Sequence, residues 1–181
     1  PVIFEKEALL GGMMRYGIPD YRLPQAVLQK EIDWLLAHGV EVRTGMTLGK
    51  NVTLDELRRD FDGVILAMGC WKSSPMRVPG EDLDGVLGGI NFLYDVKTNP
   101  EVKVGRRVAV VGGGNTAMDA CRSARRLGAE EVSVLYRRSR EEMPADDLEI
   151  EEATEEGVNF IYLAAPKSIE GNGRVERVVC E

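Results

Sequence analysis

The sequence is short of the residues that build metal and dithiol centres. Its three cysteines are Cys70, Cys121 and Cys180, and no two of them form a C-x-x-C pair. This spacing argues against a zinc site, an iron–sulfur cluster or a dithiol redox centre within the chain. We expect Cys121 and Cys70 to be buried, although Cys70 directly follows L-A-M-G, which leaves contact with a bound ligand as an alternative. Reduced thiols are typical of a cytoplasmic protein.

Positive charge and long apolar runs are scarce as well. The 23 Lys and Arg residues stand against 30 Asp and Glu residues, which gives a net charge of −7. Because a general nucleic-acid binder needs a basic surface, this balance argues against nucleic acid as a partner. No apolar run reaches the roughly 20 residues of a membrane-spanning helix, so we expect no membrane partner. The single histidine, His38, is expected to interact with the end of a helix.

The composition that remains is that of an ordinary globular protein, with 44% apolar and 29% charged residues. The length of 181 residues suits one domain, or one domain with part of another. The chain begins with Pro rather than Met and shows no signal peptide, as if a preceding segment had been removed.

Hydrophobic periodicity in the first part of the chain predicts alternating strands and helices. Residues 1–4 and 40–45 have strand character, residues 8–24 are rich in Gly and Pro and read as an extended loop, and residues 24–38 repeat apolar side chains at helical spacing. A short helix is predicted over 53–61, with Thr53 and Glu56 at the spacing of a capping box. Residues 62–69 are nearly all apolar, which predicts a buried parallel strand.

The second part shows the order strand, helix, strand, helix, strand around residues 107–164, which predicts a Rossmann-like, doubly wound parallel sheet. The acidic run from Glu149 to Glu156 is expected to be the solvated face of a helix, with Ile150 and Ala153 turned inward. The remaining predictions are a buried strand at 106–112, strands at 131–138 and 158–166, helices at 90–96, 115–127 and 145–157, a turn-rich linker at 73–86 and a final strand at 173–181.

A glycine-rich turn connects a predicted strand to a predicted helix in this part. Its residues are Gly112, Gly113, Gly114, Asn115, Thr116 and Ala117, which fit G-x-G-x-x-A, the Ala-ended dinucleotide fingerprint. The first glycine permits the tight turn, the next fingerprint glycine lets backbone approach a pyrophosphate, and the alanine allows close packing. The helix start attracts the phosphates. The alternative is an ordinary connection in which Asn115 or Thr116 caps the helix.

Arginines stand where an NAD-binding unit would carry an acid, about 20 residues past the fingerprint. They are Arg137, Arg138 and, close by, Arg140. Guanidinium groups bind a 2′-phosphate with paired hydrogen bonds, whereas a carboxylate would repel it. We therefore expect NADP(H) rather than NAD(H). The alternative is that these arginines are solvated or pair with Glu141 and Glu142, which bears most on Arg140.

Four stretches of this sequence resemble a known family. They are V-V-G-G-G-N-T-A-M-D-A-C-R-S-A-R-R-L-G-A at 110–129, V-L-Y-R-R-S-R-E-E-M-P-A at 134–145, residues 4–24 with G-G-M-M-R-Y-G-I-P, and residues 64–86 with A-M-G and P-G-E-D. Together they are similar to the glutamate synthase small (beta) subunit family. That family includes related NADPH-dependent flavoproteins such as the NADP-binding subunit of ferredoxin–NADP transhydrogenases.

The resemblance implies two dinucleotide folds, with an NADP(H)-binding domain inserted into an FAD-binding domain. It assigns residues 1–75 to a partial FAD-binding segment, 76–105 to the crossover and linker, and 106–181 to the NADP(H)-binding domain, truncated at its C-terminus. The chain would thus be an internal piece of a larger flavoprotein. Without the FAD domain's own fingerprint, we expect it to bind FAD weakly or not at all.

Several residues of the first part acquire roles only through this resemblance. Glu5 would bond the FAD ribose. Gly12, Met13 and Arg15 would approach the FAD phosphates or the flavin, with residues 17–19 near the isoalloxazine. Ala67 and Gly69 would pass close to FAD. For the glycines, plain turn or strand-end roles are the alternative.

The reaction implied by the resemblance is hydride transfer from NADPH to FAD. Electrons would then pass to a ferredoxin-like iron–sulfur protein or another subunit, such as the glutamate synthase large subunit. The cofactors carry such chemistry, so we expect no catalytic side chain and no metal site. Two other classes remain. A thioredoxin-reductase-like enzyme would need a dithiol, and an NADP-binding module would show no redox turnover.

Overall fold

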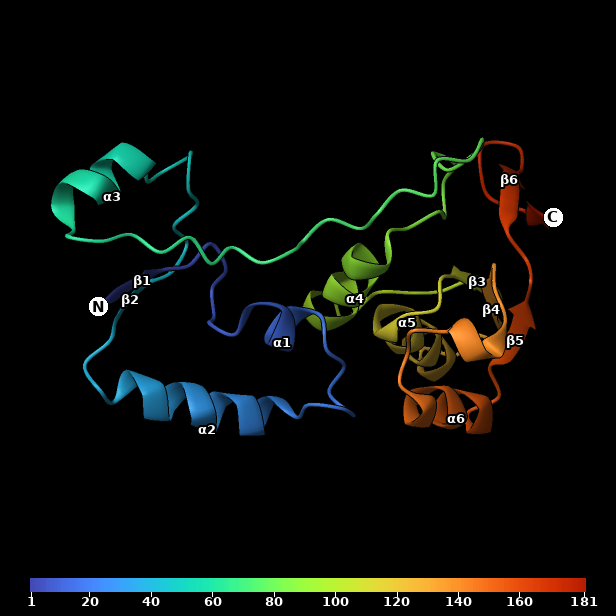
Figure 1. Ribbon diagram of the computed structural model, residues 1–181, viewed down its shortest axis with the longest axis horizontal. Helices are drawn as coiled ribbons and strands as arrows, with labels where there is room; N and C mark the ends of the chain where they lie inside the picture. Colours follow the sequence, from blue (N-terminus) through green and yellow to red (C-terminus); the bar gives the residue numbers. More distant parts are fainter. The chain divides into compact units, whose positions relative to one another are not determined.

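The computed structural model describes residues 1–181, which form two compact units, residues 1–70 and 71–181 (Figure 1). Both contain parallel strands and helices, so the predicted α/β class is confirmed. None of the helices combines the length and apolar character needed to cross a membrane.

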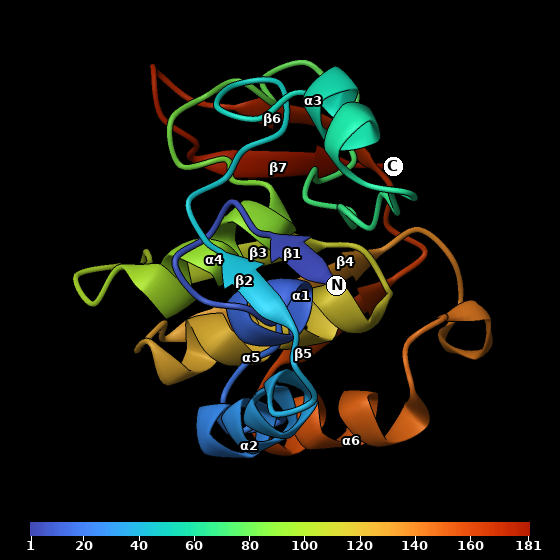
Figure 2. The ribbon, with the colours of Figure 1, turned by 90° about the vertical axis from the view of Figure 1, so that its left-hand side faces the viewer.

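The first unit is built around a two-stranded parallel ladder. Its elements are β1 (Val2–Phe4), α1 (Gly12–Tyr16), α2 (Gln25–Leu36), β2 (Glu41–Arg43) and α3 (Leu54–Asp60). Strands β1 and β2 lie side by side with Ile3 opposite Val42 (Figure 2). Buried Tyr16 of α1 and buried Leu28 and Ile32 of α2 supply much of this unit's core.

The capping box predicted for α3 is confirmed. The backbone N–H of Glu56 donates to Thr53 Oγ1 at 3.2 Å, and the N–H of Thr53 donates to Glu56 Oε2 at 2.8 Å. Two donors that the helix start would leave unpaired are thereby satisfied. The side-chain hydrogen bond from Thr53 also lowers the pKa of Glu56.

Three predictions for the first unit are wrong. The stretch 8–24 contains α1 rather than an extended loop throughout, because the carbonyl oxygen of Gly11 accepts the N–H groups of Met14 and Arg15 and so closes a helical turn. Residues 62–69 form no strand, and Ile65 is 92% exposed. A parallel strand needs a partner for its N–H and C=O groups, and the β1–β2 ladder does not pair with this segment. Cys70, predicted to be buried, is exposed.

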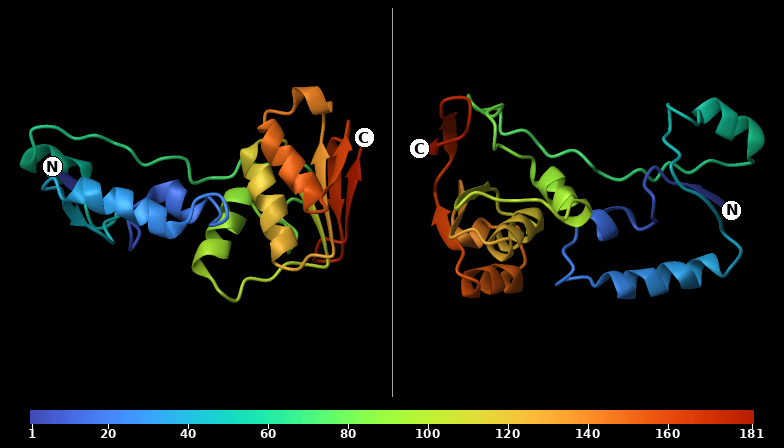
Figure 3. Two further views of the ribbon diagram at one scale, coloured as in Figure 1. Left: turned by 90° about the horizontal axis from the view of Figure 1, so that it is seen from below. Right: turned by 180° about the vertical axis from the view of Figure 1, so that it is seen from behind.

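The second unit contains a three-stranded parallel sheet in the order β3-β4-β5. Helices α5 and α6 lie side by side on one face of it (Figure 3). The elements are α4 (Gly89–Thr98), β3 (Arg107–Val111), α5 (Asn115–Arg126), β4 (Glu131–Tyr136), η1 (Arg140–Glu142), α6 (Asp147–Glu155), β5 (Asn159–Tyr162), β6 (Pro166–Glu170) and β7 (Arg177–Cys180).

The core of this unit lies between α5 and the sheet. Met118 and Cys121 of α5 and Val132 and Val134 of β4 are fully buried, so the prediction for Cys121 is confirmed. Helix α4 adds buried side chains to the same core. Strand β3 was predicted to be buried, but alternate residues such as Val111 are exposed. One face of β3 packs against the core through Val108 and Val110, whereas the face that carries Val111 does not.

An arginine joins α5 to α6. Arg122 is only 6% exposed, and its guanidinium binds Glu152 at 2.5 Å and Glu156 at 2.7 Å, with Glu149 at 3.8 Å. The prediction that the acidic run is a solvated face is therefore wrong for Glu149 and Glu156, whose carboxylates turn toward α5. Ile150 and Ala153 are buried as predicted.

The turn-rich stretch 73–86 docks on an antiparallel hairpin formed by β6 and β7. The N–H of Ile169 donates to the carbonyl of Pro79 at 2.8 Å, and that of Val175 donates to the carbonyl of Asp84 at 2.8 Å. The strand predicted over 158–166 is in fact divided, because β5 ends at Tyr162 and Leu163 adopts φ 55° before β6 begins.

Candidate functional site

The glycine-rich turn lies between the end of β3 and the start of α5, where the sequence predicted it. Gly112 has φ 138°, a backbone conformation that favours glycine, and its N–H donates to the carbonyl of Leu135 at 3.1 Å. Gly114 is the N-cap of α5 with φ −97°. A Cβ added at Gly114 would meet no atom within 4 Å, so this position faces open space.

Helix α5 begins without a side-chain cap. The N–H groups of Ala117 and Met118 both donate to the carbonyl of Gly114, at 2.8 and 3.2 Å. The N–H groups of Asn115 and Thr116 precede them and have no acceptor one helical turn earlier. The alternative in which Asn115 or Thr116 caps the helix is thus not what the structure shows, and the helix start presents free donors beside Gly114.

Gly113 is buried, whereas Gly112 and Gly114 on either side of it are partly exposed. A Cβ on it would lie 2.5 Å from Cε2 of Tyr136 and 3.0 Å from Cγ of Met143. The inner side of the turn is therefore closed by these two side chains. Glycine is required here by packing rather than by a ligand.

The connection from β4 to α6 is hydrogen-bonded to the turn. The N–H of Ala145 donates to the carbonyl of Gly113 at 3.0 Å, and the N–H of Asp146 donates to Asn115 Oδ1 at 3.2 Å. Farther back, the Tyr136 hydroxyl donates to the carbonyl of Glu142 at 2.8 Å. The start of α6 is consequently fixed next to the start of α5, an arrangement that the sequence reasoning did not predict.

The three predicted arginines follow β4 but differ in their surroundings. Arg137 and Arg138 are exposed, and neither guanidinium has an ion-pair partner in the chain. Arg140, in η1, binds Asp147 through Nη2 and Oδ1 at 2.7 Å. This hydrogen bond raises the pKa of Arg140. The expected alternative for Arg140, pairing with Glu141 or Glu142, is replaced by this pairing with α6.

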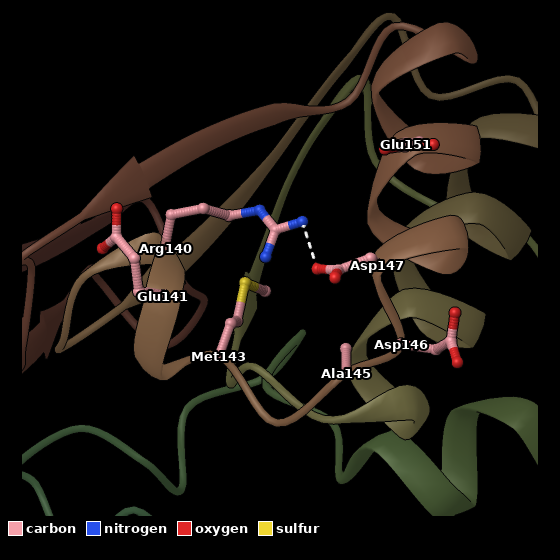
Figure 4. A pocket seen from close by; sticks show the side chains of 7 residues that line it. All are labelled: Arg140, Glu141, Met143, Ala145, Asp146, Asp147 and Glu151. Carbon is pink, nitrogen blue, oxygen red and sulfur yellow. Dashed lines mark hydrogen bonds and ion pairs between the residues drawn. The ribbon is translucent and has the colours of Figure 1, made fainter.

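A pocket of about 690 Å³ opens beside Arg140. Figure 4 shows the Arg140 side chain extending across it to Asp147. Its lining residues are Arg140, Glu141, Met143, Ala145, Asp146, Asp147 and Glu151. Sequence reasoning missed the acidic members, because their sequence spacing alone does not show that η1 and the start of α6 face each other.

The predicted residues of the first unit lie around β1 and α1. Glu5 directly follows β1, and its Oε1 accepts the N–H of Glu7 at 2.8 Å. Gly12 adopts φ 50° with open space at its Cβ position, and Met13 is half-buried. Ala67 and Gly69 lie in the exposed segment after α3.

Arg15 is buried, and its guanidinium is occupied within the first unit. It donates to the carbonyl of Leu10, to Gln25 Oε1 at 3.1 Å and to Gln29 Oε1 at 2.6 Å. In this arrangement the side chain joins α1 to α2. Its contact with FAD stays a prediction.

Comparison with known proteins shows the family to which the chain belongs. The sequence pattern of the pyridine nucleotide-disulphide oxidoreductases matches residues 4–181. The chain belongs to this family. In this member of the family the turn between β3 and α5 has the form G-x-G-x-x-A, and the three cysteines are all free thiols.

Relatives of this family member confirm the resemblance seen in the sequence. The NADPH-Fe(3+) oxidoreductase subunit beta of Geobacter sulfurreducens is 46% identical over 94% of the chain and 26% of the relative. The NADP(+)-dependent formate dehydrogenase subunit beta of Moorella thermoacetica is 44% identical over 98% of the chain and 26% of the relative. The glutamate synthase [NADPH] small chain of Escherichia coli K12 is 36% identical over 98% of the chain.

The chain spans 26% of the first two relatives and 40% of the third. Among solved structures, Mycobacterium tuberculosis FprA in complex with NADPH matches with a TM-score of 0.86 at 20% identity, over 99% of this chain and 56% of that one. T. acidophilum thioredoxin reductase matches with a TM-score of 0.63 at 16% identity, over 98% of this chain and 60% of that one. Likeness at these identities shows the fold.

Proposed function

We propose that this chain is the NADP(H)-binding part of a flavoprotein oxidoreductase of the glutamate synthase small-subunit type. In the whole protein, hydride would pass from NADPH to FAD, and electrons would continue to an iron–sulfur protein or partner subunit. Residues 106–181 would bind NADP(H), residues 1–75 would contribute to the FAD side, and residues 76–105 would connect them.

One observation carries the nucleotide assignment. The free N–H groups at the start of α5 lie beside Gly114, where a Cβ would meet nothing. A helix start with open space above a glycine is the arrangement that a pyrophosphate needs, because backbone donors and the helix dipole both favour negative charge there. Gly112 shapes this turn and Ala117, which is 8% exposed, packs beneath it.

The choice of NADP(H) over NAD(H) rests on Arg137 and Arg138. Both follow β4 directly, both are exposed, and no carboxylate of the chain neutralises them. Two unpaired guanidinium groups form a favourable site for a phosphate dianion. The names of the relatives, which include NADPH or NADP(+), agree with this choice.

For the FAD side, we propose Glu5, Gly12, Met13, Ala67 and Gly69. Glu5 suits this role because it directly follows a parallel strand, as the ribose-binding acid of a dinucleotide-binding unit does. Arg15 suits it less in this conformation, since its donors are already used by Leu10, Gln25 and Gln29.

Bound nicotinamide and flavin supply hydride-transfer chemistry, so no side chain of this chain is assigned a catalytic role and no metal site is proposed. The chain's own contribution is to bind and orient. The fingerprint turn would hold the pyrophosphate, and the arginines would fix the ribose-phosphate end. We propose the cytoplasm as the location, which fractionation of cells producing the tagged protein would test.

The electron acceptor has three candidates. A glutamate synthase large subunit is the partner expected from the resemblance. A subunit of a formate dehydrogenase or metal-reducing complex is the second, favoured by identities of 44% and 46% against 36% for the glutamate synthase chain. A transhydrogenase-type ferredoxin acceptor belongs to the same class of iron–sulfur partner. An NADP-binding module without turnover is the remaining alternative.

Calorimetric titration of the chain with NADPH and with NADH tests the proposal. We expect tighter binding of NADPH, and loss of that preference when Arg137→Ala and Arg138→Ala are combined. Equal affinities for both nucleotides in the unaltered chain would contradict it. Bound-flavin absorbance, and its bleaching by NADPH in the whole protein, would then separate an oxidoreductase from a binding module.

A further inference from the structure

We propose that Asp147 is a specificity-determining residue, whose carboxylate holds the Arg140 guanidinium and competes for it with the 2′-phosphate of the nucleotide. The inference rests on the proposed binding of NADP(H). It divides the three arginines into two classes. Arg137 and Arg138 are free to bind phosphate, whereas Arg140 must first leave Asp147.

The ion pair between Arg140 and Asp147 is weak enough for a ligand to displace it. Arg140 Nη2 and Asp147 Oδ1 are 2.7 Å apart, and this is the one hydrogen bond between the two side chains. Figure 4 shows the guanidinium at the far end of an extended side chain that crosses the pocket. Asp147 is 81% exposed and Arg140 35% exposed, so water and salt reach the pair and its strength is modest.

The backbone around the pair is fixed relative to the nucleotide turn. Asp147 is the first residue of α6, and the residues just before it bind the turn through Ala145 with Gly113 and Asp146 with Asn115. The backbone of Asp147 is thereby held at the pocket, and its carboxylate reaches Arg140 from there.

The charges that line the pocket indicate that its carboxylates compete with a phosphate for Arg140 and do not help to bind the phosphate. Four carboxylates, those of Glu141, Asp146, Asp147 and Glu151, line it together with the single guanidinium of Arg140. A phosphate dianion approaching Arg140 would meet this negative surround and would also have to displace Asp147. No such acid is paired with Arg137 or Arg138.

Asp147 binds Arg140 but does not cap helix α6. The N-cap of α6 is Asp146, whose Oδ1 accepts the N–H of Leu148 at 2.9 Å. Asp147→Asn therefore keeps the cap and the side-chain shape while it removes the charge. Glu155→Gln is the matched control, because it removes one exposed carboxylate from the same helix outside the pocket.

Calorimetry with NADPH and with NADH would be carried out on the chain and on Asp147→Asn, Arg140→Ala, the double variant and Glu155→Gln. We expect Asp147→Asn to tighten NADPH binding about two- to fivefold, the size of one exposed ion pair. NADH affinity should stay unchanged. The gain should vanish in the Arg140→Ala background, and Glu155→Gln should show none. Thermal unfolding would confirm that all variants are folded.

Three results would overturn the inference: an unchanged NADPH affinity in Asp147→Asn, a weaker one, or a gain that persists without Arg140. Failure of the proposed function has a different signature. In that case the unaltered chain would show no preference for NADPH, and Arg137→Ala with Arg138→Ala would change nothing. A chain that prefers NADPH but does not respond to Asp147→Asn keeps the proposed function and loses this inference.

Discussion

The backbone N–H of Ala145 lies 3.0 Å from the carbonyl oxygen of Gly113 and donates a hydrogen bond to it. The bond joins the segment that follows the arginines to the middle of the fingerprint turn. A second bond, from the N–H of Asp146 to Asn115 Oδ1, extends the connection to the start of α5. Changes in the turn should therefore be felt by the arginine segment as well.

Gly113→Ala should destabilise the second unit. The added methyl group would lie 2.5 Å from the Tyr136 ring and 3.0 Å from Met143, both of which are buried. Overpacking of this kind costs about 1–3 kcal/mol in the free energy of unfolding. Urea unfolding followed by circular dichroism would measure it. A variant as stable as the unaltered chain would show that Tyr136 moves aside at no cost.

Gly114→Ala should leave the stability of the chain nearly unchanged but weaken the binding of NADPH. Its φ of −97° is accessible to alanine and the added Cβ meets no atom, so stability should change by less than about 0.5 kcal/mol. The methyl group would occupy the space proposed for the pyrophosphate, and NADPH affinity should fall by about tenfold, the equivalent of one lost charge-assisted hydrogen bond. Unchanged affinity in calorimetry would place the pyrophosphate elsewhere.

The α5–α6 ion pairs should make stability depend on pH. Burial raises the pKa of Glu156, but hydrogen bonds from Arg126 and Arg122 outweigh it and leave the pKa below its usual value. A carboxyl with a lowered folded-state pKa stabilises the fold above its unfolded pKa, and this contribution is lost as the pH falls through the folded value.

We therefore expect the free energy of unfolding to decrease as the pH is lowered from about 5 to 3, and Glu156→Gln to flatten that part of the profile. At neutral pH the same variant should be less stable by about 1–3 kcal/mol, because Arg122 stays buried with fewer partners. Urea unfolding at a series of pH values gives both numbers. Parallel profiles for the two proteins would show that Glu156 does not contribute.

Cysteine reactivity should distinguish the three thiols. Burial raises the pKa of Cys121 to about 12, and its thiol donates to the carbonyl of Met118 at 3.2 Å, whereas Cys70 and Cys180 are exposed. Iodoacetamide at pH 8 should alkylate Cys70 and Cys180 in the folded chain and all three thiols in urea. Peptide mass spectrometry would detect this. Rapid labelling of Cys121 under native conditions would contradict the packing of α5.

Sequence patterns predicted correctly those features that depend only on contacts between residues close together in the chain. The capping box of Thr53 with Glu56 and the turn from Gly112 to Ala117 both depend on residues within one or two turns, and both form as predicted. The apolar run 62–69 has all the local character of a strand, yet a strand exists only where a neighbour pairs with it. No local pattern contains that condition.

In the candidate site, too, the features set by local sequence were predicted and the contact between separate elements was not. Arg137 and Arg138 are recognisable from their distance to the fingerprint, because the length of a strand–helix–strand unit sets it. The pairing of Arg140 with Asp147 was not predicted. Glu141 and Glu142 are nearer in sequence, but Glu142 turns back to cap η1, with its Oε2 accepting the N–H of Ser139 at 3.2 Å.

The central claim, that Arg137 and Arg138 bind a 2′-phosphate, is tested most directly on the phosphate itself. A phosphorus NMR titration of NADP+ bound to the chain would follow the 2′-phosphate resonance between about pH 8 and 4, across its free pKa near 6. Two guanidinium groups should lower the pKa of the bound phosphate by about one unit or more, and Arg137→Ala with Arg138→Ala should abolish the shift. A bound 2′-phosphate that titrates as it does in free NADP+ would contradict the claim.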